Sequence, residues 1–361
     1  MLKTYPFYIK ATIILFGLIL FVYTLGSLRN ILTPVCFALL LAILLNRLVV
    51  KFQKLKVSKT WSIIISLVIA FTVMAGVGYF LTSQILSFGD DMPVLKKRFI
   101  EIFAQLQQLI NNKLGFSIQK QDKWLAQAGT GVQSVIGQTL GTVAGSLGIL
   151  LLLPVYTFLL LFYKNLILNF LHEVFADEDE QKVVEVLQET KTAIEKYMVG
   201  LLLEGMVVAI LNTSALLLIG VKYAVLLGVI GAILNVLPYI GGVIAILLPV
   251  IIATITKDGL QTQLAITAAY LVIQFIDNHL LIPLIVSSRV KINAFISIFI
   301  VLLGGALWGV SGMFLSIPFI GVLKIVFDRV EELKPWGKLL GTEVPTVQKL
   351  KLRKRNKIKA A

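Results

Sequence analysis

Long apolar runs recur along this chain and are separated by short polar or charged segments. Several runs approach the length of about 20 residues that a helix needs to cross a hydrocarbon core about 30 Å thick. The runs are continuously apolar rather than alternating, which is typical of membrane helices and excludes a transmembrane β-barrel. We therefore predict an all-α, polytopic transmembrane helical protein with about eight membrane segments.

The first part of the chain predicts three spans followed by a polar insert. Residues 1–82 hold three helices, and so few residues separate Ala11–Leu28 from Ile31–Leu45 that we predict a tight hairpin. Residues 83–138 place apolar side chains at helical spacing among charged and Gln residues, which predicts an extracytoplasmic amphipathic helical insert. The insert is interpreted either as a spacer that packs on the membrane domain or a neighbouring subunit, or as a lid over a substrate.

The remaining chain divides by composition into four segments. Residues 139–163 predict the fourth span, and residues 164–198 predict a cytoplasmic amphipathic helical segment that leads into the next span. Residues 199–328 predict a transport core, and residues 329–361 a basic cytoplasmic tail that contacts anionic lipid.

The predicted core repeats one unit, an ordinary span followed by an overlong apolar run. Val199–Ile219 precedes Tyr223–Thr256, and Leu260–Val286 precedes Asn293–Phe327. As a straight helix, either overlong run would extend about 50 Å at 1.5 Å per residue, which is about 20 Å more than the hydrocarbon core. Each run must therefore tilt strongly, protrude, or fold back at its Gly/Pro break. Folding back would make two re-entrant hairpins.

The breaks in these two runs are candidate parts of a transport site. Non-helical backbone at membrane depth survives only where protein or a water-filled cavity satisfies it. Breaks at corresponding places in two repeats indicate a binding site, although the glycines could instead serve helix packing alone. The candidate residues of the breaks are Asn235, Pro238, Gly241, Gly242, Gly304, Gly305, Gly309 and Gly312.

Asp277 is the candidate coupling residue. A carboxyl in an apolar span costs roughly 3 kcal/mol on insertion scales, so it should face the protein interior or a cavity. There it could exchange a proton for a cation or a solute as access alternates. Gln274, Asn278 and Glu204 could supply further oxygen atoms, whereas His279 is interpreted as a packed or hydrogen-bonded histidine.

Two other interpretations of Asp277 stay open. Asp277 could be a structural acid that pairs with Arg289 or Lys291, or that lies at the membrane interface. Glu204 and Asn212 share one span and are predicted to face roughly opposite sides of it.

Composition and charge support the membrane class. The 361 residues are 58% hydrophobic and 14% charged, with a net charge of +14, and the mean hydropathy is +0.91. Lys and Arg concentrate in loops and the tail, which follows the positive-inside rule and argues against nucleic acid as a partner. One predicted loop contains Arg47, Lys51, Lys54, Lys56 and Lys59 and has no acid. By the positive-inside rule, this loop and the N-terminus are predicted to lie in the cytoplasm.

The sequence lacks the residues that several kinds of chemistry require. The single Cys36 and two histidines are too few for a disulfide framework or a metal cluster. The chain contains no phosphate-binding loop, no His-Glu-x-x-His and no Gly-x-Ser-x-Gly motif. We therefore expect no enzyme, no metal and no cofactor.

Three motifs together resemble a known family. They read N-V-L-P-Y-I-G-G, then Q-F-I-D-N-H-L-L-I-P, then L-G-G-A-L-W-G-V-S-G-M-F-L-S-I-P. Their order resembles the bacterial autoinducer-2 exporter family over nearly the whole chain. That resemblance implies about eight spans and either export of autoinducer-2 or sodium/proton antiport. It also implies an acid at Asp277 followed by an amide at Asn278, while many members have Gln where this chain has Glu204.

We thus expect a secondary transporter of the bacterial inner membrane, with both termini in the cytoplasm. The first hypothesis is an exporter of a small polar molecule, autoinducer-2-like, coupled to a proton or a monovalent cation. The alternatives are a sodium/proton antiporter and a non-transporting membrane scaffold. Membrane lipid is an expected partner, and small residues near Gly141 together with the insert predict a homo-oligomer.

Overall fold

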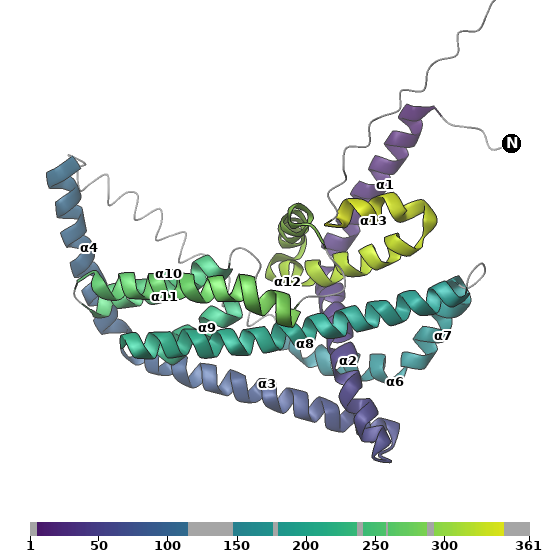
Figure 1. Cartoon of the computed structure of the whole chain (residues 1–361), viewed down its shortest axis with the longest axis horizontal. Coiled ribbons are helices and arrows are strands. Elements are labelled where there is room, and N and C mark those ends of the chain that lie inside the picture. Colours follow the sequence, from purple (N-terminus) through teal and green to yellow (C-terminus); the bar gives the residue numbers. More distant parts are fainter. Residues whose placement is uncertain are drawn as a thin grey trace, which may run out of the picture.

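A computed structural model gives the fold of this chain (Figure 1). The structure describes residues 6–114, 147–175, 180–236, 241–257, 259–286 and 292–342.

Every regular element among these residues is helical, which confirms the all-α prediction. By length and composition, six helices in the described part of the chain could cross a membrane, or seven if the bent pair α6–α7 counts as one span. The fold is therefore that of a polytopic helical membrane protein. The elements are α1 (Phe7–Ser27), α2 (Arg29–Lys54), α3 (Lys59–Asp90), α4 (Met92–Leu114), α6 (Leu147–Phe162), α7 (Lys164–Phe175), α8 (Glu180–Ile219), α9 (Ala224–Asn235), α10 (Gly241–Thr256), α11 (Gln261–Ile276), the π-helix η1 (Asp277–Val286), α12 (Ala294–Arg329), the 3₁₀-helix η2 (Glu331–Leu333) and α13 (Lys334–Leu340).

Helices α1 and α2 do not form the hairpin that we predicted. The N–H of Leu28 donates to Thr24 O and the N–H of Leu32 donates to Leu28 O, so helical hydrogen bonding continues across the junction. Leu28 itself is close to helical, with φ −89° and ψ 9°, and nothing there reverses the chain. Figure 1 shows α1 projecting from the body and α2 following on from it. No residue of α1 is buried.

The polar segments on either side of the fourth predicted span are helical where the structure describes them. Helix α3 extends to Asp90, past the predicted boundary at residue 82, and α4 follows directly. The second half of the predicted insert lies outside the described residues. Helix α7 bends by 63° from α6. Helix α8 then runs for 40 residues, so the polar segment does lead into the next span as predicted.

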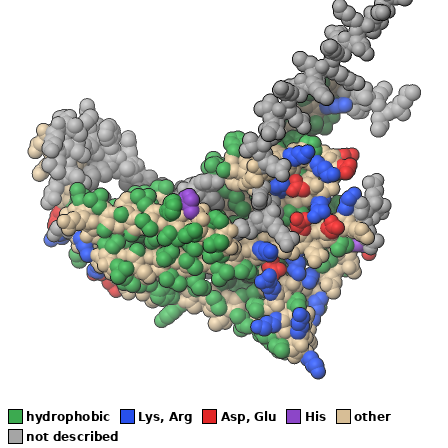
Figure 2. All heavy atoms as spheres, viewed as in Figure 1, with side chains coloured by type: hydrophobic (Ala, Val, Ile, Leu, Met, Phe, Trp, Pro, Cys, Tyr) green, Lys and Arg blue, Asp and Glu red, His purple; other side chains and the backbone are tan. Residues whose placement is uncertain are grey.

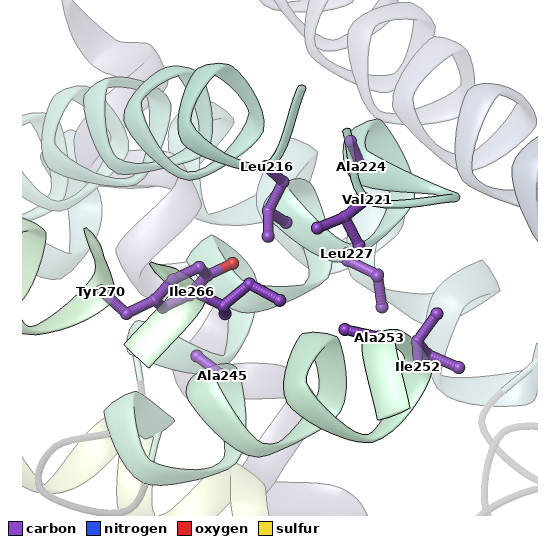
Figure 3. Close-up of a cluster of buried hydrophobic side chains, with 9 residues drawn as sticks. All are labelled: Leu216, Val221, Ala224, Leu227, Ala245, Ile252, Ala253, Ile266 and Tyr270. Carbon is purple, nitrogen blue, oxygen red and sulfur yellow. The ribbon is translucent and has the colours of Figure 1, made fainter. Parts of the chain in front are cut away.

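The first overlong run folds back on itself as the helical hairpin α9–α10. A Cβ added at Gly231 would lie 3.5 Å from the Cβ of Ala245, and one at Gly241 would clash with the backbone of Leu234. These pairs lie on opposite sides of residues 237–240, as expected for an antiparallel hairpin. Figure 3 shows the hairpin's side chains meeting those of α8 and α11 in one buried cluster. Its members are Leu216, Val221, Ala224, Leu227, Ala245, Ile252, Ala253, Ile266 and Tyr270.

The second overlong run, α12, also folds back. Gly309 has φ 63° and ψ −143°, which interrupts the helix. Ser316 Oγ donates to Ile300 O at 3.0 Å although the two residues are 16 apart in sequence. In a straight helix they would be separated by about 24 Å. Thus α12 counts as one candidate span by length, but its chain reverses at Gly309, and both overlong runs fold back at their breaks.

The helix that carries Asp277 changes its winding at that residue. Helix α11 ends at Ile276, and the π-helix η1 begins at Asp277. Pro283 lies within η1. Proline lacks an N–H, and its ring clashes with the carbonyl four residues earlier, so a wider turn relieves the conflict at this point.

The chain after α12 returns to the start of that helix. The side chain of Asn293 caps α12 by accepting from the N–H of Ile296 at 2.9 Å. The same side chain donates to Leu339 O at 2.8 Å and to Gly341 O at 3.1 Å. Folded structure therefore continues into the segment that we predicted to be a tail from residue 329.

Candidate functional site

Asp277 is the most buried acid among the described residues, with 1% of its surface exposed. Asn235 Nδ2 donates to Asp277 Oδ2 at 2.8 Å, and Gln274 Nε2 approaches the same oxygen at 3.4 Å. Asn235 is the last residue of α9, so the tip of the α9–α10 hairpin reaches the carboxyl at the start of the π-helix.

Glu204 of α8 brings a second carboxyl to Asp277. Its side chain is 6% exposed and lies within hydrogen-bonding reach of Asp277. Two carboxyl groups can share a hydrogen bond only if one of them carries a proton. Two ionised carboxylates so close together would repel each other, and a cation between them would remove that repulsion. The pair is therefore suited to holding one proton or one cation.

A small cavity lies beside this pair. Three of the residues that line it each have a buried polar atom without a hydrogen-bond partner in the described part of the protein: Asn212 Oδ1, Tyr270 Oη and Asp277 Oδ1. Buried polar groups rarely lack a partner, so three in one place indicate a bound species. The cavity is about the size of one water molecule, and it is also lined by Val208, Gly231, Asn235, Ala245, Ile273 and Gln274.

Local sequence explains how these side chains converge. On α11 the buried residues Ile266, Tyr270 and Ile273 follow a helical spacing that continues to Asp277, so all four occupy one face. Gly242 leaves room for the amide of Gln274, because a Cβ there would lie 2.7 Å from its Oε1.

The oxygen-rich lining fits a proton, a water molecule or a dehydrated monovalent cation. Apart from the carboxyl group of Asp277, its polar side chains are the amides of Asn212, Asn235 and Gln274 and the phenol of Tyr270. Among the described residues, no group of three or more His, Cys, Asp or Glu side chains could hold a metal ion. A transition-metal centre would need such ligands.

The structure brings together some of the predicted site residues and separates others. Asp277, Gln274, Glu204 and Asn235 meet, and Gly242 packs against Gln274. Asn278 is exposed and does not line the cavity. Gly241 packs against the backbone of Leu234, and Pro238 lies outside the described residues. The α12 glycines Gly304, Gly305, Gly309 and Gly312 do not line the cavity either.

The α12 glycines serve the second hairpin instead. The backbones of Gly304 and Gly312 touch, and a Cβ at Gly305 would lie 2.6 Å from Met313. At the turn, Trp308 Nε1 donates to Leu25 O of α1 at 2.9 Å. The breaks in the two repeats therefore do not form one shared cavity in the described part of the structure.

The structure also bears on the alternative role of Asp277 in an ion pair and on the interpretation of His279. Among the described residues no Lys or Arg is ion-paired with Asp277, while Arg289 and Lys291 lie outside them. His279 is exposed, its Nδ1 lies 3.0 Å from Phe275 O, and its ring stacks on Phe275 with centroids 4.2 Å apart. This agrees with a hydrogen-bonded, packed histidine.

Sequence reasoning missed Asn212 and Tyr270. We predicted Glu204 and Asn212 on roughly opposite sides of α8, but both approach the Asp277 site. Eight residues turn a helix by about 80° beyond two full turns, so they share a broad face. For Tyr270 the signal was its position seven residues before Asp277, which is close to two helical turns.

A buried acid where the tip of a helical hairpin meets a broken helix, in a chain of apolar helices, is typical of a membrane transport protein. The chain belongs to the AI-2E family of transporters, whose family model matches residues 11–332. It is 27% identical to "Putative permease PerM" of Escherichia coli over 86% of this chain and 89% of the relative. It is 24% identical to "Putative transport protein YhhT" of Escherichia coli, over 88% and 89%. It is 22% identical to "Putative transport protein YueF" of Bacillus subtilis, over 83% and 84%.

Proposed function

We propose that this protein is a secondary transporter of the bacterial inner membrane that exports a small polar solute. A proton or a monovalent cation bound at Asp277 and Glu204 couples the export to an ion gradient. The family's name and the resemblance of the motifs favour an autoinducer-2-like solute. Both termini are proposed to lie in the cytoplasm, because the Lys and Arg residues near each of them follow the positive-inside rule.

The observation that carries this proposal is the environment of Asp277. Its carboxyl is almost completely buried, and Asn235 donates to only one of its two oxygens. The other oxygen, Oδ1, is buried without a hydrogen-bond partner among the described residues, and Asp277 lines the cavity. An unpaired buried charge is costly, so the site favours states in which a proton or cation neutralises it.

The coupling follows from the contact with the α9–α10 hairpin. When Asp277 releases its ion, the carboxylate becomes the stronger acceptor for Asn235, because charged groups form stronger hydrogen bonds. Ion occupancy therefore changes how firmly the hairpin tip is held. A hairpin held differently in the two states provides the alternating access that a transporter needs.

Sodium/proton antiport is a second candidate, and the size of the cavity favours it. Room for about one water molecule accommodates a dehydrated cation but no organic solute. In the exporter hypothesis, the small cavity of this structure holds only the coupling ion. The solute then binds in the space that forms when the α9–α10 hairpin moves away. In the antiporter hypothesis, the cation itself is the cargo.

Two further expectations belong to the proposal. The protein acts as a transporter and not as an enzyme. It forms homo-oligomers, for which the wholly unburied apolar helix α1 offers a surface. A scaffold that recruits partners without transport remains the alternative, and it gives Asp277 no role in solute or ion movement.

The test is proton movement in everted membrane vesicles, followed with a pH-sensitive dye after addition of sodium, lithium or potassium. Wild type is compared with Asp277→Asn and with Asn278→Ala, a matched control at the adjacent, exposed residue. Proton release that disappears only in Asp277→Asn supports cation antiport at this site. If no cation moves protons, efflux of candidate polar solutes is measured with the same three proteins. If Asp277→Asn behaves as wild type in both assays, the proposal is wrong and the scaffold hypothesis gains support.

A further inference from the structure

Three lysines from three different helices converge at one end of the molecule. Lys59 begins α3, Lys164 begins α7, and Lys191 lies in α8. Lys59 Nζ donates to Phe162 O at 2.7 Å and lies 5.2 Å from the centroid of the Phe162 ring. Because Phe162 is two residues from Lys164, the ammonium group of Lys59 lies beside the start of α7. Lys164 is also within electrostatic range of both Lys59 and Lys191.

The position of Lys164 is fixed by a buried amide. Lys164 Nζ donates to Asn46 Oδ1 of α2 at 3.2 Å, and Asn46 is only 8% exposed. An ammonium group has three N–H donors. Lys59 and Lys164 each use one N–H donor in the hydrogen bonds described above. The other donors of both ammonium groups can bind an anion.

Acidic side chains do not neutralise these lysines within the described residues. No Asp or Glu precedes Asp90 in the sequence. Glu195, one helical turn after Lys191, is ion-paired with Arg47. The surrounding surface carries still more positive charge, and Figure 2 shows Lys and Arg gathered over this end of α2 and α3. Like charges held together without a counter-charge favour an anionic ligand.

Apolar side chains surround the same lysines. Helix α7 begins at Lys164 and bends by 63° from α6. Along it Leu166 is 66% exposed and Phe170 is 59% exposed. At the start of α3, Trp61 is 62% exposed, and tryptophan is enriched at the membrane–water interface. An amphipathic helix with Lys at its start and exposed Leu and Phe is suited to lie in that interface.

We propose that Lys59, Lys164 and Lys191 form a binding site for the phosphate headgroup of an anionic phospholipid. The lysines bind the phosphate oxygens, and the acyl chains lie against the apolar surface of α6 and α7. A free phosphate ion would use the lysines but would leave the flanking Leu166, Phe170 and Trp61 without a role. Basic pockets between membrane helices at the cytoplasmic side are known sites for anionic headgroups.

The test measures lipid retention by the full-length protein with native mass spectrometry. The protein is purified in detergent and titrated with phosphatidylglycerol or with phosphatidylcholine of the same acyl chains. The site variant carries Lys59→Gln, Lys164→Gln and Lys191→Gln. The matched control carries Lys51→Gln, Lys54→Gln and Lys56→Gln, which removes the same charge from exposed lysines in the last turn of α2 and just after it. Lys191→Gln alone is measured as well, because this exposed side chain forms no ion pair or hydrogen bond among those found in the described residues.

We expect wild type and the control to prefer phosphatidylglycerol to phosphatidylcholine. The site variant should bind phosphatidylglycerol about a hundredfold more weakly, and Lys191→Gln about fivefold, as expected for lysines near an anionic surface. Equal weakening in the site variant and the control would overturn the proposal, since total charge alone would then decide binding. Equal binding of the two lipids would overturn it too. So would displacement of the lipid by inorganic phosphate at similar concentration, which would make this a site for a soluble anion.

Discussion

Asn235 and Asp277 are 42 residues apart in sequence, yet the amide of Asn235 donates a 2.8 Å hydrogen bond to the carboxyl of Asp277. The bond joins the tip of the α9–α10 hairpin to the first residue of the π-helix. A change in the charge of Asp277 therefore acts directly on the hairpin. Short π-helical segments occur frequently at functional sites, and here the segment begins at the buried acid.

Removing the Asn235 amide should shift the site toward its ion-bound state without unfolding the protein. In Asn235→Ala, Asp277 loses its 2.8 Å donor and retains only the longer contact from Gln274. Hydrogen bonds to charged groups contribute about 1.5–3 kcal/mol, and this one favours the ion-free carboxylate, so we expect apparent ion affinity to rise about tenfold to a hundredfold. The measurement is the cation or solute concentration that gives half-maximal transport. Asn278→Ala is the control, because that exposed amide should leave affinity unchanged.

A methyl group at Gly231 should fill the cavity. An added Cβ would lie 3.2 Å from Asn212 Nδ2, 3.5 Å from Ala245 Cβ and 3.6 Å from Tyr270 Oη. The neighbours need move only by tenths of an ångström, so we expect Gly231→Ala to fold normally and lose most of its transport. The control is Gly205→Ala in α8, where nothing lies within 4 Å of the added Cβ. Full transport by Gly231→Ala would show that the cavity is not the binding site.

The turn of the second hairpin should require glycine at position 309. Its φ of 63° with ψ of −143° lies in a region that other residues rarely adopt. We expect Gly309→Ala to destabilise the protein by about 1–3 kcal/mol, measured as a lower midpoint of thermal unfolding in detergent. Gly321→Ala in the same helix is the control, since its φ is helical and nothing lies within 4 Å. Equal midpoints for the two variants would argue that α12 does not fold back at Gly309.

An ion pair between α3 and the segment before α9 should make stability depend on pH. Lys222 Nζ donates to Asp91 Oδ2 at 2.7 Å, and the Tyr223 hydroxyl donates to the same oxygen. The hydrogen bond from Lys222, followed by that from Tyr223, lowers the pKa of Asp91 below its ordinary value of 3.8. A lowered carboxyl pKa stabilises the fold above the ordinary value, and that contribution is lost as the pH falls through the lowered one.

The ion pair between Lys222 and Asp91 also makes stability fall at high pH. The hydrogen bond to Asp91 raises the pKa of Lys222 above 10.5, so its contribution is present below that value and is lost as the pH rises through the raised pKa. We expect Asp91→Asn to lower the unfolding midpoint at neutral pH, and its difference from wild type to shrink in acid below pH 3.8. Asp90→Asn, at the exposed neighbouring acid, should not show this pattern.

The sequence alone was enough to predict the class of fold and the burial of Asp277. Continuous apolar runs and their length predict membrane helices, because no other common element buries them. Asp277, Gln274 and Asn235 are recognisable as polar residues in such runs, where polarity is costly. Their meeting was not predictable, since it depends on the α9–α10 hairpin placing its tip against η1.

The predictions that were wrong also depended on three-dimensional geometry that the sequence does not show. Asn278 adjoins Asp277 in sequence, but successive residues of a helix point in different directions, and this amide lies at the surface. Two runs separated by few residues suggested an α1–α2 hairpin, although Leu28 keeps a nearly helical backbone and the chain does not turn back. Whether the overlong runs reverse depends on close backbone contacts such as Gly304 against Gly312, which composition does not reveal.

The most direct test of the account is whether Asp277 carries a proton that the coupling ion displaces. A hydrophobic carbodiimide adds to protonated, buried carboxyl groups, and mass spectrometry of the digested protein locates the adduct. We predict an adduct on Asp277 or on its partner Glu204, with a yield that falls when sodium, lithium, potassium or the exported solute is added. If both carboxyls stay unmodified, or if no added ion or solute changes the yield, the central claim is contradicted.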